Sequence, residues 1–576
     1  MDVTCRNFRT SEFANLVEMA RYRASHHPDR KAFVFLRNGE VEQSVLTFGE
    51  LDRRARSLAV RLHERFEPGE RIVLMHSQGH EFVVAFFACI YAGLVAVPVT
   101  PPSCSTGVSR LARIADDAGA AGVCLGREGF DGAALTQSGA HRRLECVVTS
   151  EDAGEREAEW IAPNIDPGNL ALLQYTPGAS RGVMASHANL LHNQSLIQHA
   201  FGHSPGTIGV SWLPLHHDMG LIGHVLQPVY VGCTSVLLSS AAFLAKPVRW
   251  LEAISRYRAT TSGGPNFAYD IALRRVRAGQ LIDLDLSRWS VAYNGSEPVH
   301  AETLAGFANK FAVCGFRPEA FVACYGLADA TLLVSSSLRG RLPEVQMLDL
   351  DKLRRNRVHE ATAATRSVRA VVSCGPVIDQ DLLIVEPGGC TRCLPGEVGE
   401  IWLRGPSVAK GYWNQPQTTQ AAFGARLAGG EGPFLRTGDL GFLLDGELYV
   451  TGKLSDLIEI GGRKHHPHDI EKTVRESHPL LDTGASVAVC LKGQRGQRRR
   501  LIIMQEVARD QLVRLPRDEI LSSARGAVLK ANGLKLEDIM FLAQGSLPRT
   551  ASGLIRREAC PSVCVDASRP GRTVYR

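Results

Sequence analysis

Lysine is scarce in this sequence of 576 residues, since only 11 of its 65 basic residues are Lys and the other 54 are Arg. The surplus of positive charge is also small, because 65 basic and 59 acidic residues leave a net charge of +6. A nucleic-acid-binding protein carries a concentrated basic surface, so no nucleic acid is expected as a partner. The one dense basic run, residues 494–500, is interpreted as a solvated hairpin tip.

The sequence also lacks an unbroken apolar segment long enough to cross a membrane. Residues 82–99 carry no charge over 18 positions, but Gly93 and Pro98 interrupt them. This pattern predicts a buried helix that ends near Ala92, a turn at Gly93 and a strand over residues 94–97. No membrane span is therefore expected.

Paired cysteine motifs and a signal peptide are missing as well. The 14 Cys are scattered, and the first residues, MDVTCRNFRTSEF, contain no apolar core, so we expect reduced thiols and a cytoplasmic location. Cys390 and Cys393 form one CxxC motif with no second pair and no nearby His cluster, so a structural zinc site is not expected there.

Length and pattern predict more than one folding unit of the α/β class. A single core stops growing at roughly 250–300 residues. Strands at 72–75, 122–124, 171–175 and 235–238 alternate with helices, which predicts stacked βα units with mostly parallel sheets. Asn38-Gly39 predicts a hairpin over residues 33–48, and Thr47 with Glu50 predicts a capping box for the helix that follows.

The second half of the chain changes character. Residues 336–373 show few periodic apolar residues and no clear element, so an irregular insertion is predicted. Short strands at 400–403, 447–450 and 457–460 follow, separated by Gly turns. The roughly 120 residues after Asp456 are enough for a separate small α+β domain.

A loop rich in Gly, Ser and Thr follows an apolar strand at residues 174–183 (QYTPGASRGV). Such loops present backbone N–H groups and hydroxyls to phosphate oxygens. Strand connections without a ligand use the same residue types, so this loop alone leaves its role open.

Seven further motifs follow in order, and they are WLPLHHDMGL (212–221), SGGPNF (262–267), NGSEP (294–298), CYGLADAT (324–331), LRTGDL (435–440), TGKLSD (451–456) and LPRTASGL (547–554). This ordered set resembles the adenylate-forming (acyl-activating) superfamily, and within it the fatty acyl-AMP ligases. The resemblance covers nearly the whole chain. It implies an N-terminal domain over residues 1–455 and a mobile C-terminal domain over 456–576, hinged near Asp456.

The resemblance also implies a two-step reaction that uses ATP and Mg²⁺. A fatty acid carboxylate attacks the α-phosphate of ATP to give acyl-AMP and pyrophosphate, and the acyl group then passes to the phosphopantetheine thiol of an acyl carrier protein. The acceptor would be an acyl carrier protein or a carrier domain of a polyketide or nonribosomal peptide synthase, in lipid, polyketide or lipopeptide biosynthesis. Residues 336–373 fall where this family carries an insertion associated with poor use of coenzyme A, which favours the carrier protein as acceptor.

Site residues are implied position by position. Tyr325 and Gly326 would lie along the adenine, opposite Asn294, Gly295 and Ser296. Asp439 would accept the ribose hydroxyls, and Lys453 stands where the family usually has Arg. His217 would flank the acyl carboxylate, and Asp329, in place of a family Glu, would bind magnesium. The phosphate loop would contribute Thr176, Gly178, Ser180, Arg181 and Gly182.

Two of these positions also have simpler interpretations. Asp439 could cap a turn, and His217 could form a structural pair with Asp218. The run His465, His466, Pro467, His468 resembles a metal cluster in isolation, but the family carries a related run there, so a structural role is preferred.

Two departures from the family pattern affect adenylation. The phosphate loop is three residues shorter and has lost its Lys, which leaves Arg181 as its only cation. Leu554 occupies the position of the family lysine that bridges the carboxylate and the α-phosphate. Arg549, Arg556 and Arg557 lie close in sequence, and Arg549 is the candidate catalytic replacement. Adenylation is therefore predicted to be impaired.

Three functions remain open at this point. The protein is a slow fatty acyl-AMP ligase, a protein that binds acyl-adenylates or catalyses only the transfer step, or a non-catalytic partner of a polyketide or nonribosomal peptide synthase.

Overall fold

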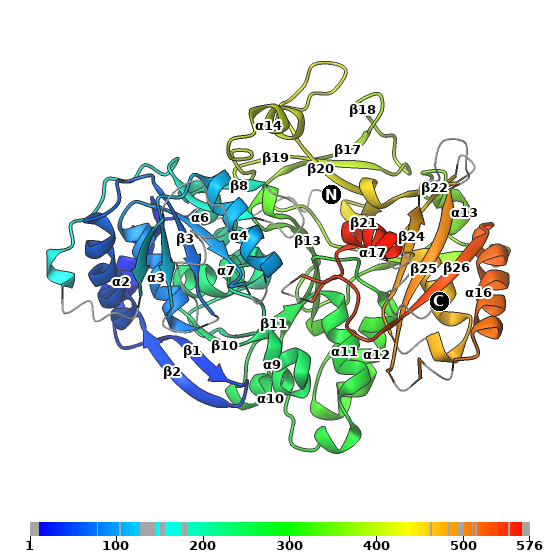
Figure 1. Ribbon diagram of the computed structural model, residues 1–576, viewed down its shortest axis with the longest axis horizontal. Coiled ribbons are helices and arrows are strands. Elements are labelled where there is room, and N and C mark those ends of the chain that lie inside the picture. Colours follow the sequence, from blue (N-terminus) through cyan, green and yellow to red (C-terminus); the bar gives the residue numbers. More distant parts are fainter. Residues whose placement is uncertain are drawn as a thin grey trace.

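The computed structural model describes residues 11–77, 79–102, 105–126, 144–149, 156–175, 181–460, 463–481, 484–491, 499–509, 511–512, 515–550 and 553–566. Its largest sheet has eight strands in the order β14-β13-β12-β11-β9-β10-β1-β2 and is parallel except at its two edge pairs (Figure 1). The strands are β1 (Lys31–Arg37), β2 (Val41–Thr47), β9 (Ile208–Ser211), β10 (Thr234–Leu238), β11 (Thr261–Gly264), β12 (Val291–Asn294), β13 (Phe321–Gly326) and β14 (Leu333–Ser336).

A six-stranded sheet, in the order β6-β5-β3-β4-β7-β8, is parallel except for the pair β7 and β8. Its strands are β3 (Arg71–Met75), β4 (Val95–Val99), β5 (Gly122–Leu125), β6 (Glu145–Val148), β7 (Leu170–Tyr175) and β8 (Gly182–Ser186). The predicted α/β class with mostly parallel sheets is confirmed.

Helices cover both sheets. They are α1 (Leu16–His26), α2 (Phe48–His63), α3 (His80–Tyr91), α4 (Ser105–Ala118), α6 (His187–Phe201), α7 (Asp218–Leu221), the π-helix η2 (Ile222–Leu226), α8 (Gln227–Val231), α9 (Ser240–Ala245), α10 (Val248–Tyr257), α11 (Asn266–Arg275) and α12 (Ala301–Phe311). The hairpin of β1 and β2 and the Thr47–Glu50 capping box are confirmed. Among the described residues no helix is long and apolar enough to cross a membrane.

The charge-free segment forms the predicted helix, turn and strand. Residues Phe82 to Tyr91 of α3 are all buried, and Gly93 takes a φ of 71° at the end of the helix. That left-handed conformation favours glycine, and it turns the chain into β4 one residue later than the predicted strand start.

The segment 336–373 is more ordered than predicted. Strands β15 (Val345–Asp349) and β16 (Val368–Val372) form an antiparallel pair, and the short helix α13 (Leu350–Leu353) follows β15. The prediction of no clear element was wrong, because only a few apolar residues of the segment are buried and they show no clear periodicity. Two of them, Leu348 and Leu353, are buried in a small core with Phe442 and Tyr449, which lie outside the segment.

An antiparallel sheet of five strands follows, in the order β18-β17-β19-β20-β21. Its strands are β17 (Asp381–Glu386), β18 (Thr391–Arg392), β19 (Gly399–Arg404), β20 (Leu435–Leu444) and β21 (Glu447–Lys453), with α14 (Pro416–Phe423) between β19 and β20. The predicted short strands at 400–403 and 447–450 are confirmed.

The last part of the chain builds its own small cores. Two apolar clusters contain only residues from Ile458 onward, on the two faces of the sheet β24-β25-β26. Its elements are β22 (Ile458–Ile460), β23 (Arg463–His465), α15 (Pro467–Glu476), β24 (Ser486–Leu491), β25 (Arg500–Val507), α16 (Arg517–Asn532), β26 (Leu536–Ala543) and α17 (Cys560–Asp566). β24 and β25 pair antiparallel, as a hairpin requires, but residues 492–498 at the predicted tip lie outside the described residues.

This C-terminal part contacts the rest of the molecule through polar side chains. Lys472 of α15 forms an ion pair with Glu302 of α12. Arg369 of β16 lies 3.4 Å from Asp469, and Arg354 donates to the carbonyl oxygen of Ala531 over 3.2 Å. In Figure 1 the C-terminal elements, in orange and red, lie beside β21 and α12.

Candidate active site

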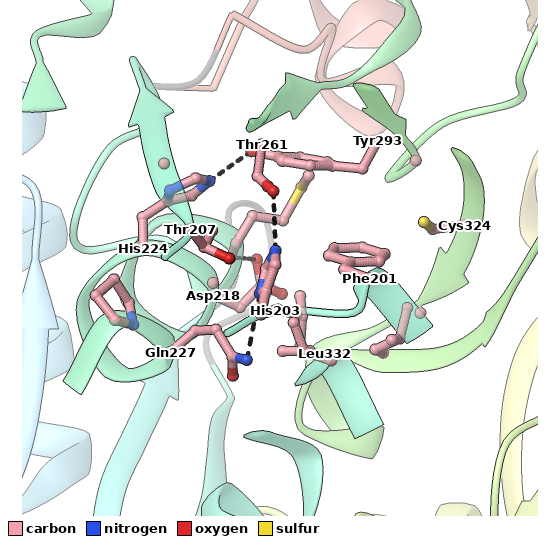
Figure 2. Close-up of a pocket in the computed structure, with 18 of the residues that line it drawn as sticks. Phe201, His203, Thr207, Asp218, His224, Gln227, Thr261, Tyr293, Cys324 and Leu332 are labelled. Carbon is pink, nitrogen blue, oxygen red and sulfur yellow. Dashed lines mark hydrogen bonds between the residues drawn. The ribbon is translucent and has the colours of Figure 1, made fainter. Parts of the chain in front are cut away.

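A mostly apolar cavity runs along the eight-stranded sheet (Figure 2). One end lies beside Gly295, Ser296 and Tyr325, at the carboxyl ends of β12 and β13. The other end lies beside Thr234 and Thr261, the first residues of β10 and β11. Because these strands are parallel, the cavity extends along them, from their amino ends to their carboxyl ends. Ligands of α/β sheets bind at the carboxyl ends of the strands, so that end is the candidate active site.

The backbone around the carboxyl ends requires glycine. A Cβ on Gly326 would lie 1.7 Å from the carbonyl oxygen of Leu332, and a Cβ on Gly295 would lie 2.9 Å from that of Cys324. The Tyr325 hydroxyl donates to Oδ2 of Asp439 over 2.9 Å. The predicted adenine and ribose residues Gly295, Ser296, Tyr325, Gly326 and Asp439 are therefore neighbours.

Asp439 lies in a polar but shielded position. Its carboxylate is 8% exposed, and it pairs in register with Lys453 across β20 and β21. Burial raises the pKa of Asp439, although the ammonium of Lys453 and the Tyr325 hydroxyl oppose the increase. The turn-cap interpretation does not account for this side chain, which accepts from Tyr325 rather than from the backbone of its own turn.

Asp329 lies close enough to Arg181 and Lys453 to interact with their charges. The Tyr412 hydroxyl donates a short hydrogen bond to Oδ1 of Asp329, and the Arg181 guanidinium lies 5.3 Å from the Tyr412 ring centroid. Burial raises the pKa of Asp329, and the charges of Arg181 and Lys453 oppose that shift. This group combines one carboxylate with two cations, which suits a phosphate chain with a bound metal ion.

His217 pairs with its neighbour Asp218, as the simpler interpretation holds. Nδ1 of His217 lies 2.5 Å from Oδ1 of Asp218, and Asp218 lines the cavity. Burial disfavours a charged imidazole, but the Asp218 carboxylate outweighs burial and raises the pKa of His217. The contact with Asp218 therefore holds the His217 imidazole in a fixed orientation next to a residue that lines the cavity.

Some predicted site residues are not brought to the cavity. Asn294 is fully buried, and its amide donates to Asn266 over 3.2 Å, so it supports the wall rather than forming it. Thr176, Gly178 and Ser180 lie outside the described residues, while Gly182 begins β8. The described residues contain no group of three His, Cys, Asp or Glu able to hold a metal, in HHPH or at Cys390 and Cys393.

The turn that carries Leu554 reaches the N-terminal part. Leu554 donates its N–H to Thr550 Oγ1 and accepts from the Thr550 N–H, over 3.1 and 2.8 Å. Gly553 has a φ of +93°, and a Cβ there would lie 3.0 Å from Cζ of Phe267. Phe267 donates to Glu297, which adjoins Ser296 of the cavity wall. Position 554 is therefore close to the candidate active site.

The arginines near Leu554 have partners of their own. Arg549 forms a 2.8 Å ion pair with Glu506, which is 2% exposed, and donates to the carbonyl oxygen of Gly553. Arg557 holds both carboxylate oxygens of Glu471, and Arg556 pairs with Glu558. Arg549 thus braces the turn from within the C-terminal part.

Glu297, next to Ser296 of the cavity wall, is a buried carboxyl that the sequence did not single out. Its Oε1 accepts from the Phe267 N–H over 2.6 Å, and burial raises its pKa to about 7. The charges of Arg549 and Arg557 act against that increase. The sequence does contain a hint, because Glu297 lies inside the NGSEP motif. The family resemblance, however, implies no role for a carboxylate at that position.

Glu297 predicts a pH dependence of stability. The unfolded carboxyl ionises near pH 4.5 and the folded one near 7, so the folded state holds the extra proton between these values. The free energy of unfolding should therefore fall by roughly 3 kcal/mol as the pH rises through this window, and the loss should persist above it. Glu297→Gln should remove this loss in urea unfolding at pH 4.5 and 7.5. An equal slope in both proteins would contradict the assignment.

Comparison with known proteins places the chain in a family. A family profile described as AMP-binding enzyme matches residues 20–413, more than half of the chain. A medium-chain-fatty-acid–[acyl-carrier-protein] ligase, JamA from Moorena producens, is 42% identical over 564 residues, which are 95% of both chains. A ligase of the same description from Teredinibacter turnerae, TtuA, is 33% identical and covers 95% of this chain and 93% of its own.

Solved structures agree with these relatives. The fatty acid AMP ligase from Legionella pneumophila is 37% identical with a TM-score of 0.75, and covers 97% of both chains. A fatty acyl-adenylate ligase from a study of the E. coli and L. pneumophila enzymes has a TM-score of 0.87 at 32% identity, covering 97% of this chain and 99% of its own. The protein is an AMP-binding enzyme of the adenylate-forming superfamily. Within that superfamily it belongs to the fatty acyl-AMP ligases.

Proposed function

We propose that this protein converts a medium-chain fatty acid into an acyl-adenylate and passes the acyl group to an acyl carrier protein. The observation that supports this is the cavity itself, because an apolar channel with the candidate nucleotide residues at one end suits an alkyl chain whose carboxyl meets a nucleotide. JamA and TtuA, which match nearly the whole chain, are named as ligases for medium-chain fatty acids and the acyl carrier protein.

The proposed roles follow from position. Tyr325 and Gly326 would hold the adenine, Asp439 the ribose hydroxyls, and the His217–Asp218 pair would orient the acyl carboxylate toward the α-phosphate. Arg181 and Lys453 would bind phosphate oxygens beside Asp329. The carboxylate oxygen attacks the α-phosphorus and the bond to pyrophosphate breaks, so positioned cations supply most of what the protein adds.

Asp329 fits a magnesium site of the open kind. Mg²⁺ is bound by one or two carboxylates and completes its shell with phosphate oxygens and water. Asp329 offers one carboxylate beside the cations proposed for the phosphates, so Mg²⁺ would be held there together with ATP. When bound, the ion would neutralise negative charge on the phosphates.

We also propose that residues 1–455 and 456–576 are two domains that move about Asp456. The separate cores from Ile458 onward and the polar contacts between the parts support this, since such interfaces permit relative motion. In the described state, the turn with Leu554 faces the candidate site. Transfer would use another orientation of the C-terminal domain.

Impaired adenylation remains part of the proposal. Leu554 provides no charge where the family has lysine, and both Arg549 and Arg557 are held by buried carboxylates. A protein that binds acyl-adenylates and catalyses only the transfer is the second candidate. It is supported by the Tyr325–Asp439 hydrogen bond beside an apolar cavity together with the uncharged side chain at position 554.

Two assays separate these candidates. Hydroxamate trapping with ATP and saturated acids of different chain length measures adenylation, which is expected to be detectable but slow. Synthetic acyl-AMP with a phosphopantetheinylated carrier protein measures transfer alone. Transfer without adenylation would favour the second candidate, and failure of both assays in a folded protein would refute the proposal.

Gly223 provides a direct test of the acyl pocket. It lies in the π-helix η2, lines the cavity, and a Cβ there would meet only Cδ2 of Leu332, at 4.0 Å. Gly223→Phe should fill the channel and weaken binding of decanoyl against butanoyl adenylate analogues by about tenfold or more, since overpacking costs ~1–3 kcal/mol. Binding by calorimetry measures the ratio. Gly526→Phe, at an open position in α16, is the control and should leave it unchanged.

A further inference from the structure

The end of the cavity remote from the nucleotide residues is polar. His203, Gln227 and Thr261 form one chain of contacts there: His203 Nε2 lies 3.0 Å from Thr261 Oγ1, and its Nδ1 lies 3.3 Å from the Gln227 side-chain amide. Figure 2 shows His203 between these two residues. An end built only to hold methyl and methylene groups would be apolar throughout, so this end requires an explanation.

His224 adds an unused hydrogen-bonding atom at the same level. Its side chain is 4% exposed and lines the cavity from the π-helix η2, and its Nε2 lies 2.7 Å from the Tyr293 hydroxyl. Nδ1 has no hydrogen-bond partner in the part of the chain that the structure describes. It lies 3.6 Å from the point where a Cβ on Gly209 would stand. Gly209 pairs in register with Thr261, so both histidines face the same section of the channel.

The wall between the two ends is apolar. Ile197, Phe201, Met219 and Leu332 line it and suit a saturated chain. In register, Thr261 is level with Val291, four residues before Gly295. Four residues of parallel strand rise ~13 Å, which an extended chain of roughly ten carbons would span.

We propose that the acid bound here carries a hydroxyl group at or next to the end of its chain, held by Nδ1 of His224. This inference rests on the proposed function and specifies its substrate class. A hydroxyl both donates and accepts, so it satisfies either tautomer of an imidazole whose other nitrogen is held by Tyr293. A plain alkyl chain would leave Nδ1 buried without a partner, and sites that bond a substrate hydroxyl discriminate strongly against the analogue that lacks it.

The test compares matched pairs of stable adenylate analogues, the sulfamoyl adenosines of octanoic and decanoic acid and of their terminally hydroxylated forms. Calorimetric binding to the full chain does not depend on catalysis, so slow adenylation cannot mask the result. The hydroxylated member of at least one pair is expected to bind about 10- to 100-fold more tightly. Equal or weaker binding in both pairs would overturn the inference while leaving the proposed function intact. If no analogue binds, the proposed function fails and the inference falls with it.

Variants locate the effect. His224→Leu combined with Tyr293→Phe removes both polar partners and should reduce the preference to within about threefold, because neither residue then leaves the other unsatisfied. His224→Gln keeps a hydrogen-bonding group and should retain part of the preference. Met219→Leu changes an apolar wall residue with little change in volume, so the preference should stay at the wild-type value. A preference unchanged in the double variant would assign the hydroxyl elsewhere and refute the role of His224.

Discussion

Leu554→Lys is expected to raise the rate of acyl-adenylate formation by about two orders of magnitude. Removing one donor to developing charge typically slows an enzyme by about 10²–10³, and this substitution restores such a donor. The turn that carries residue 554 contacts Phe267 through Gly553 and so lies beside Glu297 and the cavity wall. A lysine at position 554 would therefore begin beside the candidate active site. Hydroxamate trapping with saturating ATP and decanoic acid measures the rate.

Leu554→Met is the matched control, because methionine has an unbranched stem similar to that of lysine but no charge. Its rate should equal that of the wild type. Binding of a decanoyl adenylate analogue should change far less than the rate in Leu554→Lys, since the added cation acts on charge that develops during the reaction. Fast wild-type adenylation that the lysine leaves unchanged would contradict the claim that Leu554 limits this step.

Most of the fold could be predicted because periodicity and turn chemistry agree with it. The parallel strands are short apolar runs between Gly and polar turns, and Thr47 and Gly93 mark a helix start and a helix end by their capping chemistry. The sheet over 345–372 could not be predicted in this way. Few residues of its strands are buried. One of them, Leu348, packs in a small core with Phe442 and Tyr449, which are distant in sequence.

Motifs allow candidate site residues to be named from the sequence, and the roles of these residues stay predictions. Tyr325 and Asp439 are 114 positions apart and yet share a hydrogen bond, so the structure brings two of the predicted residues together. Sequence does not show which way a strand residue points, and Asn294, predicted for the adenine wall, is buried and donates to Asn266. The polar end of the channel escaped prediction for a similar reason, since His203, His224 and Thr261 come from separate elements and converge only through the packing of η2 on the sheet.

Arg557→Ala is expected to destabilise the C-terminal part by about 3–5 kcal/mol. Nη1 and Nη2 of Arg557 contact the Glu471 carboxylate, at 2.5 and 2.7 Å, and Glu471 is 4% exposed. Removing one partner of a buried pair leaves the other charge without compensation, which is the costly outcome. The segment after Leu554 would also lose its anchor to α15, because Arg557 is in that segment and Glu471 is in α15. The same carboxylate accepts from the Ala488 N–H in β24.

Arg556 provides the control at the neighbouring position. Its partner Glu558 is more than half exposed, and an exposed pair of this kind contributes at most about 1 kcal/mol, so Arg556→Ala should unfold close to the wild type. Urea unfolding followed by circular dichroism measures the difference. Because Arg557 is committed to Glu471, its loss should lower stability without removing a catalytic charge. If Arg557→Ala stayed as stable as the wild type but lost adenylation, Arg557 rather than an absent lysine would have to supply the missing cation.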